Sequence, residues 1–140
     1  MVTLLLTYWC SPLIVAEQTT TVTTHVIVNA SAEIKTIDEY ELMAIFSMHK
    51  QYWESGDKIQ IVSLKQSHPL HQQFTQEILG IQPYQLERGW NRNIFKGTGK
   101  KPIVVDNIEE LIKRVGNTRG AIGYIDSNKK IVETNIRIVK

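Results

Sequence analysis

The chain has 140 residues, of which 42% are hydrophobic and 21% are charged. This length fits one domain with a core of its own, and the composition excludes an intrinsically disordered chain. The 16 basic and 14 acidic residues leave a formal net charge of +2, which is too balanced to indicate a nucleic-acid-binding protein. With Cys10 as its single cysteine, the chain offers neither an intramolecular disulfide nor a cysteine-based metal site.

The first 16 residues contain no charged side chain and hold two apolar stretches, residues 4–6 and 13–15. An apolar segment that ends on a small residue, here Ala16, before a polar run is typical of a secretory signal peptide. It falls short of the roughly 20 apolar residues that a membrane span needs. We therefore expect residues 1–16 to be a signal peptide and the protein to be exported to the periplasm. A buried N-terminal strand and an uncleaved anchor are the alternatives.

Residues 17–24 are polar and lack an apolar period, which predicts a leader ahead of one folded domain over residues 25–140. That domain contains no cysteine, and we expect no membrane span in it. The absence of cysteine suits an oxidising compartment, where a stray thiol is a hazard.

The domain starts with a short β-branched run, residues 25–29, which predicts a buried strand. Asp38 follows as a helix cap with Glu41 as its capping-box partner, and apolar residues at helical spacing come next. After a loop, residues 59–64 predict the second strand.

Two helices with proline in the first turn come next. Pro69 lies at the start of one, which Gly80 ends, and Pro83 begins the other. Along the second helix we expect apolar contacts from Tyr84, Leu86, Trp90, Ile94 and Phe95. A basic glycine loop over residues 96–101 then leads into a third strand at residues 102–105.

Asn107, with Glu110 as its box partner, begins the last helix. Residues 120–125 predict a strand whose glycines indicate close approach of another backbone, and residues 131–139 alternate like a half-exposed final strand. This alternation of strands and helices predicts an α/β fold. We expect a three-layer sandwich with helices on the faces of a mixed, mostly parallel sheet.

No residue pattern indicates an enzyme. The serines lack the glycine-flanked turn of hydrolases, and Glu109 and Glu110 fit the solvated face of a capped helix. The glycines and lysines of residues 97–101 do not make a phosphate loop, because a helix precedes them and a strand follows. His68 and His71 are three residues apart, but two histidines without a third ligand are a weak case for a metal site. We therefore expect no catalysis, no cofactor and no metal.

The helix start at Ser67 is the best candidate for a ligand site. Free backbone N–H groups and the positive end of the helix dipole favour an anion there. Ser67 and His68 add side-chain donors, and Lys65 adds positive charge. The alternative is a simple capped helix, which describes most helix starts.

Several motifs fall in one order along the chain. The most specific are W-N-R-N-I-F-K-G-T-G at residues 90–99 and G-A-I-G-Y at residues 120–124. They follow A-I-F at residues 44–46, Leu79-Gly80, and Y-Q-L at residues 84–86. Together these motifs resemble the solute-binding proteins of phosphate ABC transporters, which are type II periplasmic binding proteins.

The resemblance implies a periplasmic protein with the fold of one lobe of a two-lobed binding protein, because the match runs from about His25 to Ile125. The family's Ser-Gly-Thr at the helix start is replaced here by His68-Pro69-Leu70, so we expect weak oxyanion binding or none. The predicted site for phosphate or another oxyanion consists of Lys65, Ser67, His68, Leu70 and His71.

The alternative function is an interaction module of the cell envelope without a small-molecule ligand. An exposed apolar face would then contact another envelope protein or a second copy of the chain.

Overall fold

The computed structural model describes residues 22–140. The predicted signal peptide and most of the predicted leader therefore lie outside the described residues, as does Cys10. Within residues 22–140, no helix has the combination of length and apolar character that crossing a bilayer requires.

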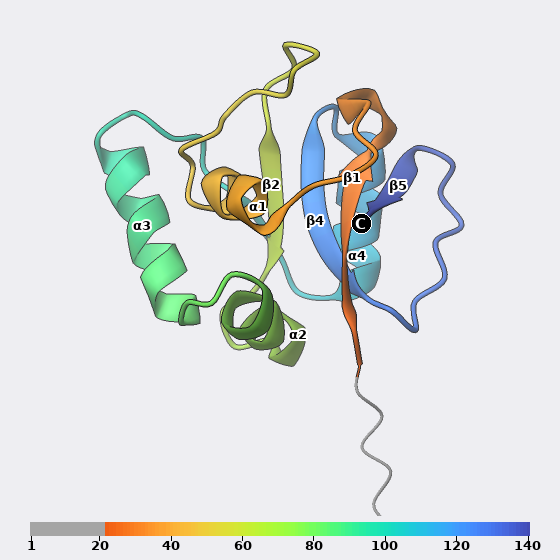
Figure 1. Ribbon diagram of the computed structural model, residues 1–140. Helices are drawn as coiled ribbons and strands as arrows, with labels where there is room; N and C mark the ends of the chain where they lie inside the picture. Colours follow the sequence, from red (N-terminus) through yellow and green to blue (C-terminus); the bar gives the residue numbers. More distant parts are fainter. Residues whose placement is uncertain (1–21) are drawn as a thin grey trace, which may run out of the picture.

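One sheet of five strands organises the domain, in the order β3-β2-β4-β1-β5 (Figure 1). The strands are β1 (Thr24–Asn29), β2 (Gln60–Leu64), β3 (Ile103–Val105), β4 (Ala121–Asp126) and β5 (Ile136–Val139). The helices are α1 (Glu39–Phe46), α2 (Pro69–Gln73), α3 (Pro83–Phe95) and α4 (Ile108–Asn117). The predicted order of elements is confirmed.

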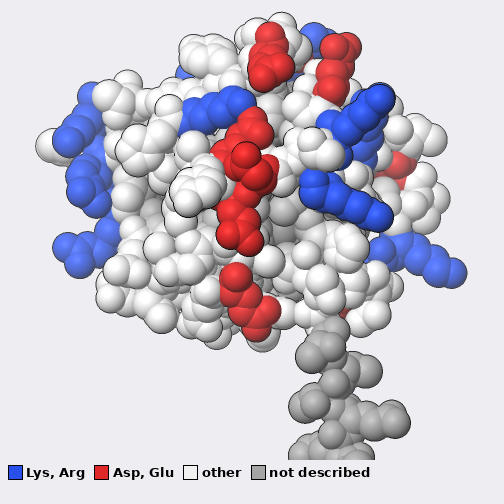
Figure 2. Space-filling view, viewed as in Figure 1, with Lys and Arg blue, Asp and Glu red and all other residues white. Residues whose placement is uncertain are grey.

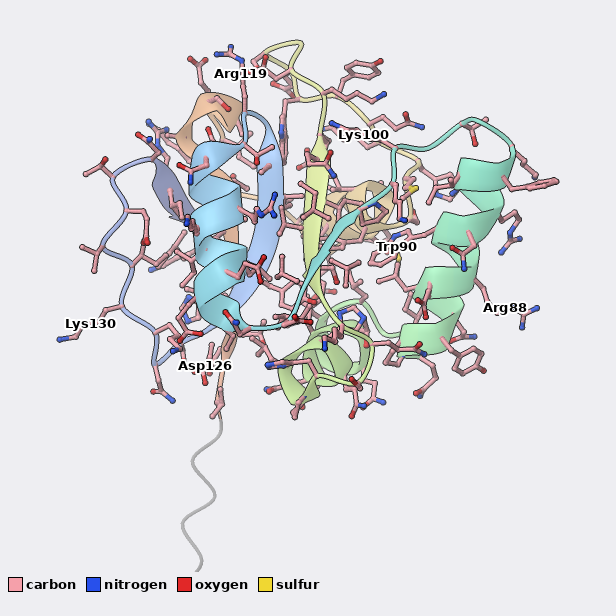
Figure 3. The ribbon with its side chains drawn as sticks, turned by 180° about the vertical axis from the view of Figure 1, so that it is seen from behind. Arg88, Trp90, Lys100, Arg119, Asp126 and Lys130 are labelled. Carbon is pink, nitrogen blue, oxygen red and sulfur yellow. The ribbon has the colours of Figure 1, made fainter. Side chains whose placement is uncertain are left out.

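The sheet is mixed. β2 runs parallel to β3 and β4, whereas β1 runs antiparallel to β4 and β5. Figure 1 shows α1 on the near face of the sheet, and Figure 3, seen from behind, shows α4 on the other face. The expected α/β architecture with helices on both faces of a mixed sheet is confirmed. The sheet is not mostly parallel as predicted, because two of its four strand pairings are parallel and two are antiparallel.

The helix caps predicted from the sequence are present. The Asp38 carboxylate accepts the Glu41 N–H at 2.7 Å at the start of α1. The Asn107 side-chain oxygen accepts the Glu110 N–H at 2.8 Å at the start of α4. Each cap satisfies one of the N–H groups that a helix start leaves without a partner, so the local sequence fixes where these helices begin.

The helix that starts at Pro69 changes its winding midway. α2 is followed by a π-helical turn over Phe74–Ile78, in which the Leu79 N–H donates to the Phe74 carbonyl at 3.1 Å. The Thr75 hydroxyl donates to the His71 carbonyl at 3.0 Å, and a hydroxyl bond of this kind back to the preceding turn bends a helix. The predicted continuous helix to Gly80 is therefore two short pieces.

The final strand is shorter than predicted, covering only the end of residues 131–139. β5 pairs with β1 alone, from Ile136 opposite Asn29 to Val139 opposite Val26. After Asn29 the chain turns into a short 3-10 helix, and although the Ala30 N–H still donates to the Asn135 carbonyl at 2.8 Å, the strand pairing does not extend beyond Ile136. The alternation predicts a strand over residues 131–139, but the chain forms one only where β1 lies beside it as a partner.

The predicted apolar contacts of α3 divide between two sides of the helix. Leu86 and Trp90 are buried, whereas Tyr84 is 51% exposed and Phe95 is 94% exposed. At 3.6 residues per turn, Tyr84 and Phe95 lie on the side of α3 opposite Leu86. The expectation of apolar contacts therefore fails for Tyr84 and Phe95, which face solvent instead.

Candidate functional site

The carboxyl end of β2 is the place where this topology favours a ligand. From β2 the chain crosses to β3 on one side, and from β3 it returns to β4 on the other side. In open α/β sheets, ligands bind outside the carboxyl ends of the strands at such a switch point. The loop from Lys65 to His68 lies there and leads into α2, at the lower edge of the sheet in Figure 1.

An open hollow of about 490 Å³ lies beside this loop, lined by Lys65, Gln66, Ser67 and Gln72. All four residues are exposed. Within residues 22–140, the side chains of Gln66, Ser67 and Gln72 take part in no hydrogen bond. Two of the predicted site residues, Lys65 and Ser67, therefore lie together, and two glutamine amides that the sequence did not single out join them.

The positive charge of Lys65 already has a partner. Its ammonium lies 2.7 Å from the Asp106 carboxylate, which follows β3 at the same edge of the sheet. Both side chains are more than half exposed, so the pair is screened by water and opens at little cost. An anion in the hollow would compete with Asp106 for this lysine.

The structure places His68 and Leu70 in a helix cap. The His68 Nδ1 accepts the Leu70 N–H at 3.1 Å, so the ring acts as the N-cap of α2. This bond occupies the His68 Nδ1 and the Leu70 N–H, two of the groups that were predicted to bind an anion. Neither of them is then free for a ligand. The geometry of this bond fits the alternative of a simple capped helix.

His71 lies in the core, where only 3% of its surface is exposed. Its Nδ1 is 2.5 Å from the Tyr124 hydroxyl and 3.2 Å from the Ser63 Oγ. Burial, with a smaller contribution from the charge of His68, lowers the pKa of His71 to about 4. A neutral imidazole that accepts a bond from Tyr124 fits this environment.

A buried polar cluster of Ser63, His71 and Tyr124 joins β2, α2 and β4 beneath the candidate site. The Tyr124 hydroxyl accepts the Leu64 N–H at 3.0 Å and lies 3.0 Å from the Ser63 Oγ. Desolvation raises the pKa of Tyr124, so this hydroxyl keeps its proton. The sequence analysis missed the cluster, although a serine and a tyrosine inside apolar strands need hydrogen-bond partners once buried.

The part of the chain that the structure describes brings together no group of three or more His, Cys, Asp or Glu residues that could hold a metal ion. The two histidines considered above use different partners, since His68 caps α2 and His71 joins the buried cluster.

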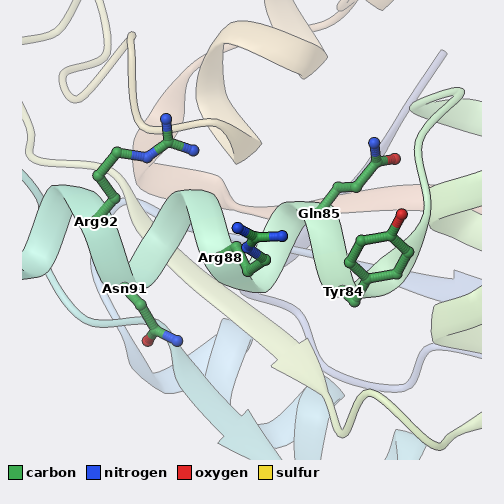
Figure 4. Close-up of a pocket in the computed structure, with 5 residues that line it drawn as sticks. All are labelled: Tyr84, Gln85, Arg88, Asn91 and Arg92. Carbon is green, nitrogen blue, oxygen red and sulfur yellow. The ribbon is translucent and has the colours of Figure 1, made fainter.

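A second hollow, of about 570 Å³, lies on the outer side of α3 (Figure 4). It is lined by Tyr84, Gln85, Arg88, Asn91 and Arg92, all from this one helix. Figure 4 shows the side chains of Arg88 and Arg92 on successive turns of the helix. The sequence analysis did not select this surface, although basic residues at four-residue spacing on an amphipathic helix were visible in the sequence.

Comparison with known proteins gives similarity at the level of the fold. No protein-family model matches the chain, and no curated protein matches it. An ABC-type phosphate transport receptor from Vibrio cholerae superposes with a TM-score of 0.65 at 14% identity, over 85% of this chain and 46% of that one. PstS from Borrelia burgdorferi superposes with a TM-score of 0.64 at 19% identity, over 85% and 47% of the two chains.

A third solved structure, described as a "Putative Phosphate ABC Transporter Substrate-Binding Protein with Bound Phosphate" from Clostridium perfringens, gives a TM-score of 0.67 at 19% identity. It is covered over 44% of its length, against 85% of this chain. The chain therefore spans less than half the length of each of these structures. The expected fold, similar to one lobe of a periplasmic binding protein, is confirmed.

Proposed function

We propose that this protein is a periplasmic binding protein, related to the solute-binding proteins of phosphate ABC transporters, that holds phosphate or a similar oxyanion weakly. The observation that supports this proposal is the open hollow at the carboxyl end of β2. One protein with a similar fold is described with bound phosphate. No catalytic role is part of the proposal.

The residues of the hollow supply the chemistry that an oxyanion needs. Gln66 and Gln72 offer amide N–H donors, Ser67 offers a hydroxyl, and Lys65 offers an ammonium that can exchange Asp106 for the anion. Of the residues predicted from the sequence, we retain Lys65 and Ser67 as ligand contacts and assign His68, Leu70 and His71 to holding the loop in place.

Binding is expected to be weak for three reasons that the geometry supplies. The hollow is open, so water competes for every donor. The charge of Lys65 is shared with Asp106. The Leu70 N–H is already bonded to His68, so it is not free to bind the anion.

Titration of the ¹⁵N-labelled protein with inorganic phosphate tests the proposal. We expect fast-exchange shifts at Gln66, Ser67 and Gln72 at millimolar phosphate. Ser67→Ala should weaken binding roughly fivefold, which corresponds to about 1 kcal/mol for one neutral hydrogen bond. The control is Ser55→Ala, in an exposed turn of the chain, which should leave the affinity unchanged. Absence of shifts around the hollow at tens of millimolar phosphate would contradict oxyanion binding.

Export to the periplasm is part of the same proposal. The uncharged apolar segment before Ala16 supports it. If the signal peptide is cleaved there, mass spectrometry of the protein recovered from the periplasm will give a mature chain that starts at Glu17. Recovery of the chain with residues 1–16 still attached would favour the alternative of an uncleaved anchor.

The second candidate function, contact with another protein, is supported by a different part of the molecule. Exposed aromatic and charged side chains on α1 and α3 make surfaces suited to a protein partner.

A further inference from the structure

A groove of about 330 Å³ lies between the end of α1 and one flank of α3. This volume falls within the range of about 300–1,000 Å³ that small-molecule sites occupy. On α3 the lining includes Gln85, Gly89, Arg92 and Lys96, which are three or four residues apart and so lie on one stripe of the helix. In Figure 4, the side chains of Gln85 and Arg92 point to the same side of α3, away from Asn91. Among the described residues, none lines both this groove and the hollow at the carboxyl end of β2.

The groove presents positive charge that no carboxylate neutralises. Within residues 22–140, neither Arg92 nor Lys96 forms an ion pair, and no aspartate or glutamate lines the groove. Figure 2 shows basic side chains gathered over α3 at the left edge of the view, apart from the acidic side chains in its middle. Both cations are therefore available to an anion, unlike Lys65, which is paired with Asp106.

The other polar side chains of the groove add hydrogen-bond donors. The Gln85 Oε1 accepts the Gln82 N–H at 2.8 Å, which leaves the amide N–H groups of Gln85 for a ligand. The His49 Nδ1 lies 2.6 Å from the Ser47 Oγ. Within the described chain the His49 Nε2 takes part in no hydrogen bond, so the outer nitrogen of the ring is also available.

Hydrogen bonds between the two helices fix the walls of the groove and occupy its carbonyl groups. The Trp90 indole N–H donates to the Phe46 carbonyl at 2.6 Å, and the Asn93 side-chain amide donates to the Ser47 carbonyl at 3.1 Å. Trp90 and Phe46 are buried. A ligand would therefore meet a preformed groove and lose little binding free energy to ordering it.

The groove also contains apolar surface and a glycine that keeps it open. Ile81 and Leu86 line it, and both pack against the hydrophobic core. A Cβ added at Gly89 would meet no atom within 4 Å, so packing within the described domain does not require glycine there. Glycine is unfavourable inside a helix, but any side chain at this position would occupy part of the groove.

We propose that this groove binds a small organic anion, whose carboxylate or phosphate group contacts Arg92 and Lys96 and whose carbon body lies against Ile81 and Leu86. A guanidinium group can direct two parallel N–H donors at two oxygens of one carboxylate or phosphate. The two cations therefore bind the charged group. The apolar side chains favour an organic anion over an inorganic ion, since a carbon body buries apolar surface there.

Titration of the purified, ¹⁵N-labelled chain with phenyl phosphate and with benzoate tests this site. We expect saturable shifts of the backbone N–H groups of Gly89, Asn93 and Lys96. Inorganic phosphate should bind at the same place about tenfold more weakly or worse, because it has no ring to bury. Shifts at Gln66 and Ser67 report the hollow at the carboxyl end of β2, so success or failure at the two sites is read separately.

Two arginines one turn apart on α3 provide a matched pair of variants. Arg92→Gln should raise the dissociation constant of phenyl phosphate about tenfold, because it removes a charged hydrogen-bond donor from the groove. Arg88→Gln makes the same substitution on the outer side of α3, away from the groove. At about 0.15 M salt, which screens distant charges, it should leave the dissociation constant unchanged.

Gly89→Leu tests the shape of the groove without weakening the fold. Leucine is favoured over glycine inside a helix, so the free energy of unfolding should not fall. The leucine side chain should fill the groove, and the shifts caused by phenyl phosphate at Asn93 and Lys96 should disappear.

Three results would overturn the proposal. One is the absence of shifts around the groove with either organic anion at tens of millimolar. Another is equal affinity of the groove for inorganic phosphate and phenyl phosphate, which would leave the apolar side chains without a role. The last is an equal loss of affinity in Arg92→Gln and Arg88→Gln, since binding would then respond to the overall charge of α3 rather than to this site.

Discussion

Replacing Gly120 by alanine is expected to lower the free energy of unfolding by about 3 kcal/mol or more, a large part of the roughly 5–15 kcal/mol that a typical domain has. Gly120 has a φ of +72°, which a residue with a Cβ adopts only at a cost. A Cβ built there would lie 2.3 Å from the Lys58 carbonyl oxygen, a contact that cannot exist without backbone movement. This close approach confirms the expectation that glycine in this part of the chain marks another backbone nearby.

The surroundings of Gly120 leave little freedom for such a movement. The Gly120 carbonyl accepts the Trp53 indole N–H at 2.9 Å and the Gln60 N–H at 3.1 Å. The Gly120 N–H donates to the Ser31 hydroxyl at 2.9 Å. A shift of this residue to make room for a methyl group would therefore break hydrogen bonds to three other segments, two of them involving buried residues.

Gly97 provides a matched control for Gly120→Ala. It has the same φ of +72°, but a Cβ there would meet no atom within 4 Å. Gly97→Ala should therefore cost only the backbone strain, about 1 kcal/mol. Urea denaturation of both variants gives the two free energies of unfolding. Equal losses at the two positions would show that the approach of Lys58 is not the cause.

Acid is expected to remove up to about 3 kcal/mol of stability through His71 alone. Burial lowers the pKa of His71 from 6.5 to about 4. Between these two pH values the unfolded chain therefore binds a proton at His71 that the folded protein does not bind. Above pH 6.5 the neutral His71 makes its full contribution to the free energy of unfolding. This contribution decreases as the pH falls towards 4, where the folded state also takes up the proton and the loss ends.

His71→Gln tests this expectation, because glutamine cannot be charged and keeps a hydrogen-bonding side chain. The free energy of unfolding of the wild type should fall from pH 6.5 to pH 5 by about 2 kcal/mol more than that of the variant. Carboxylates contribute little to the difference, since both proteins share them. His49→Gln, at an exposed position, should keep the wild-type slope. A slope that His71→Gln leaves unchanged would assign the acid sensitivity to other groups.

The type and the order of the helices and strands could be predicted from the sequence alone. Caps such as Asp38 and Asn107 act on N–H groups three residues away, and the apolar runs at residues 25–29 and 59–64 report burial directly. These are local interactions, which depend on neighbouring residues and on the period of a helix or strand. The chain order of strands and helices then sufficed to predict an α/β sheet with helices on both faces.

Which residues of the candidate site face solvent depends on contacts between segments that are distant in the sequence. His71 is one turn from Ser67 in the sequence, yet it lies in the core because Tyr124 and Ser63, from two different strands, are positioned to bond it. Lys65 forms an ion pair with Asp106 because β2 and β3 end at the same edge of the sheet.

The same dependence on distant partners explains the two elements that were predicted least well. Residues 131–139 form a strand only from Ile136 to Val139, where β1 provides a partner. The outer side of α3 has no neighbour among the described residues, so Phe95 stays exposed although its residue type predicted burial. Local periodicity fixes the type of an element, but which of its side chains are buried is set by what the rest of the chain brings against it.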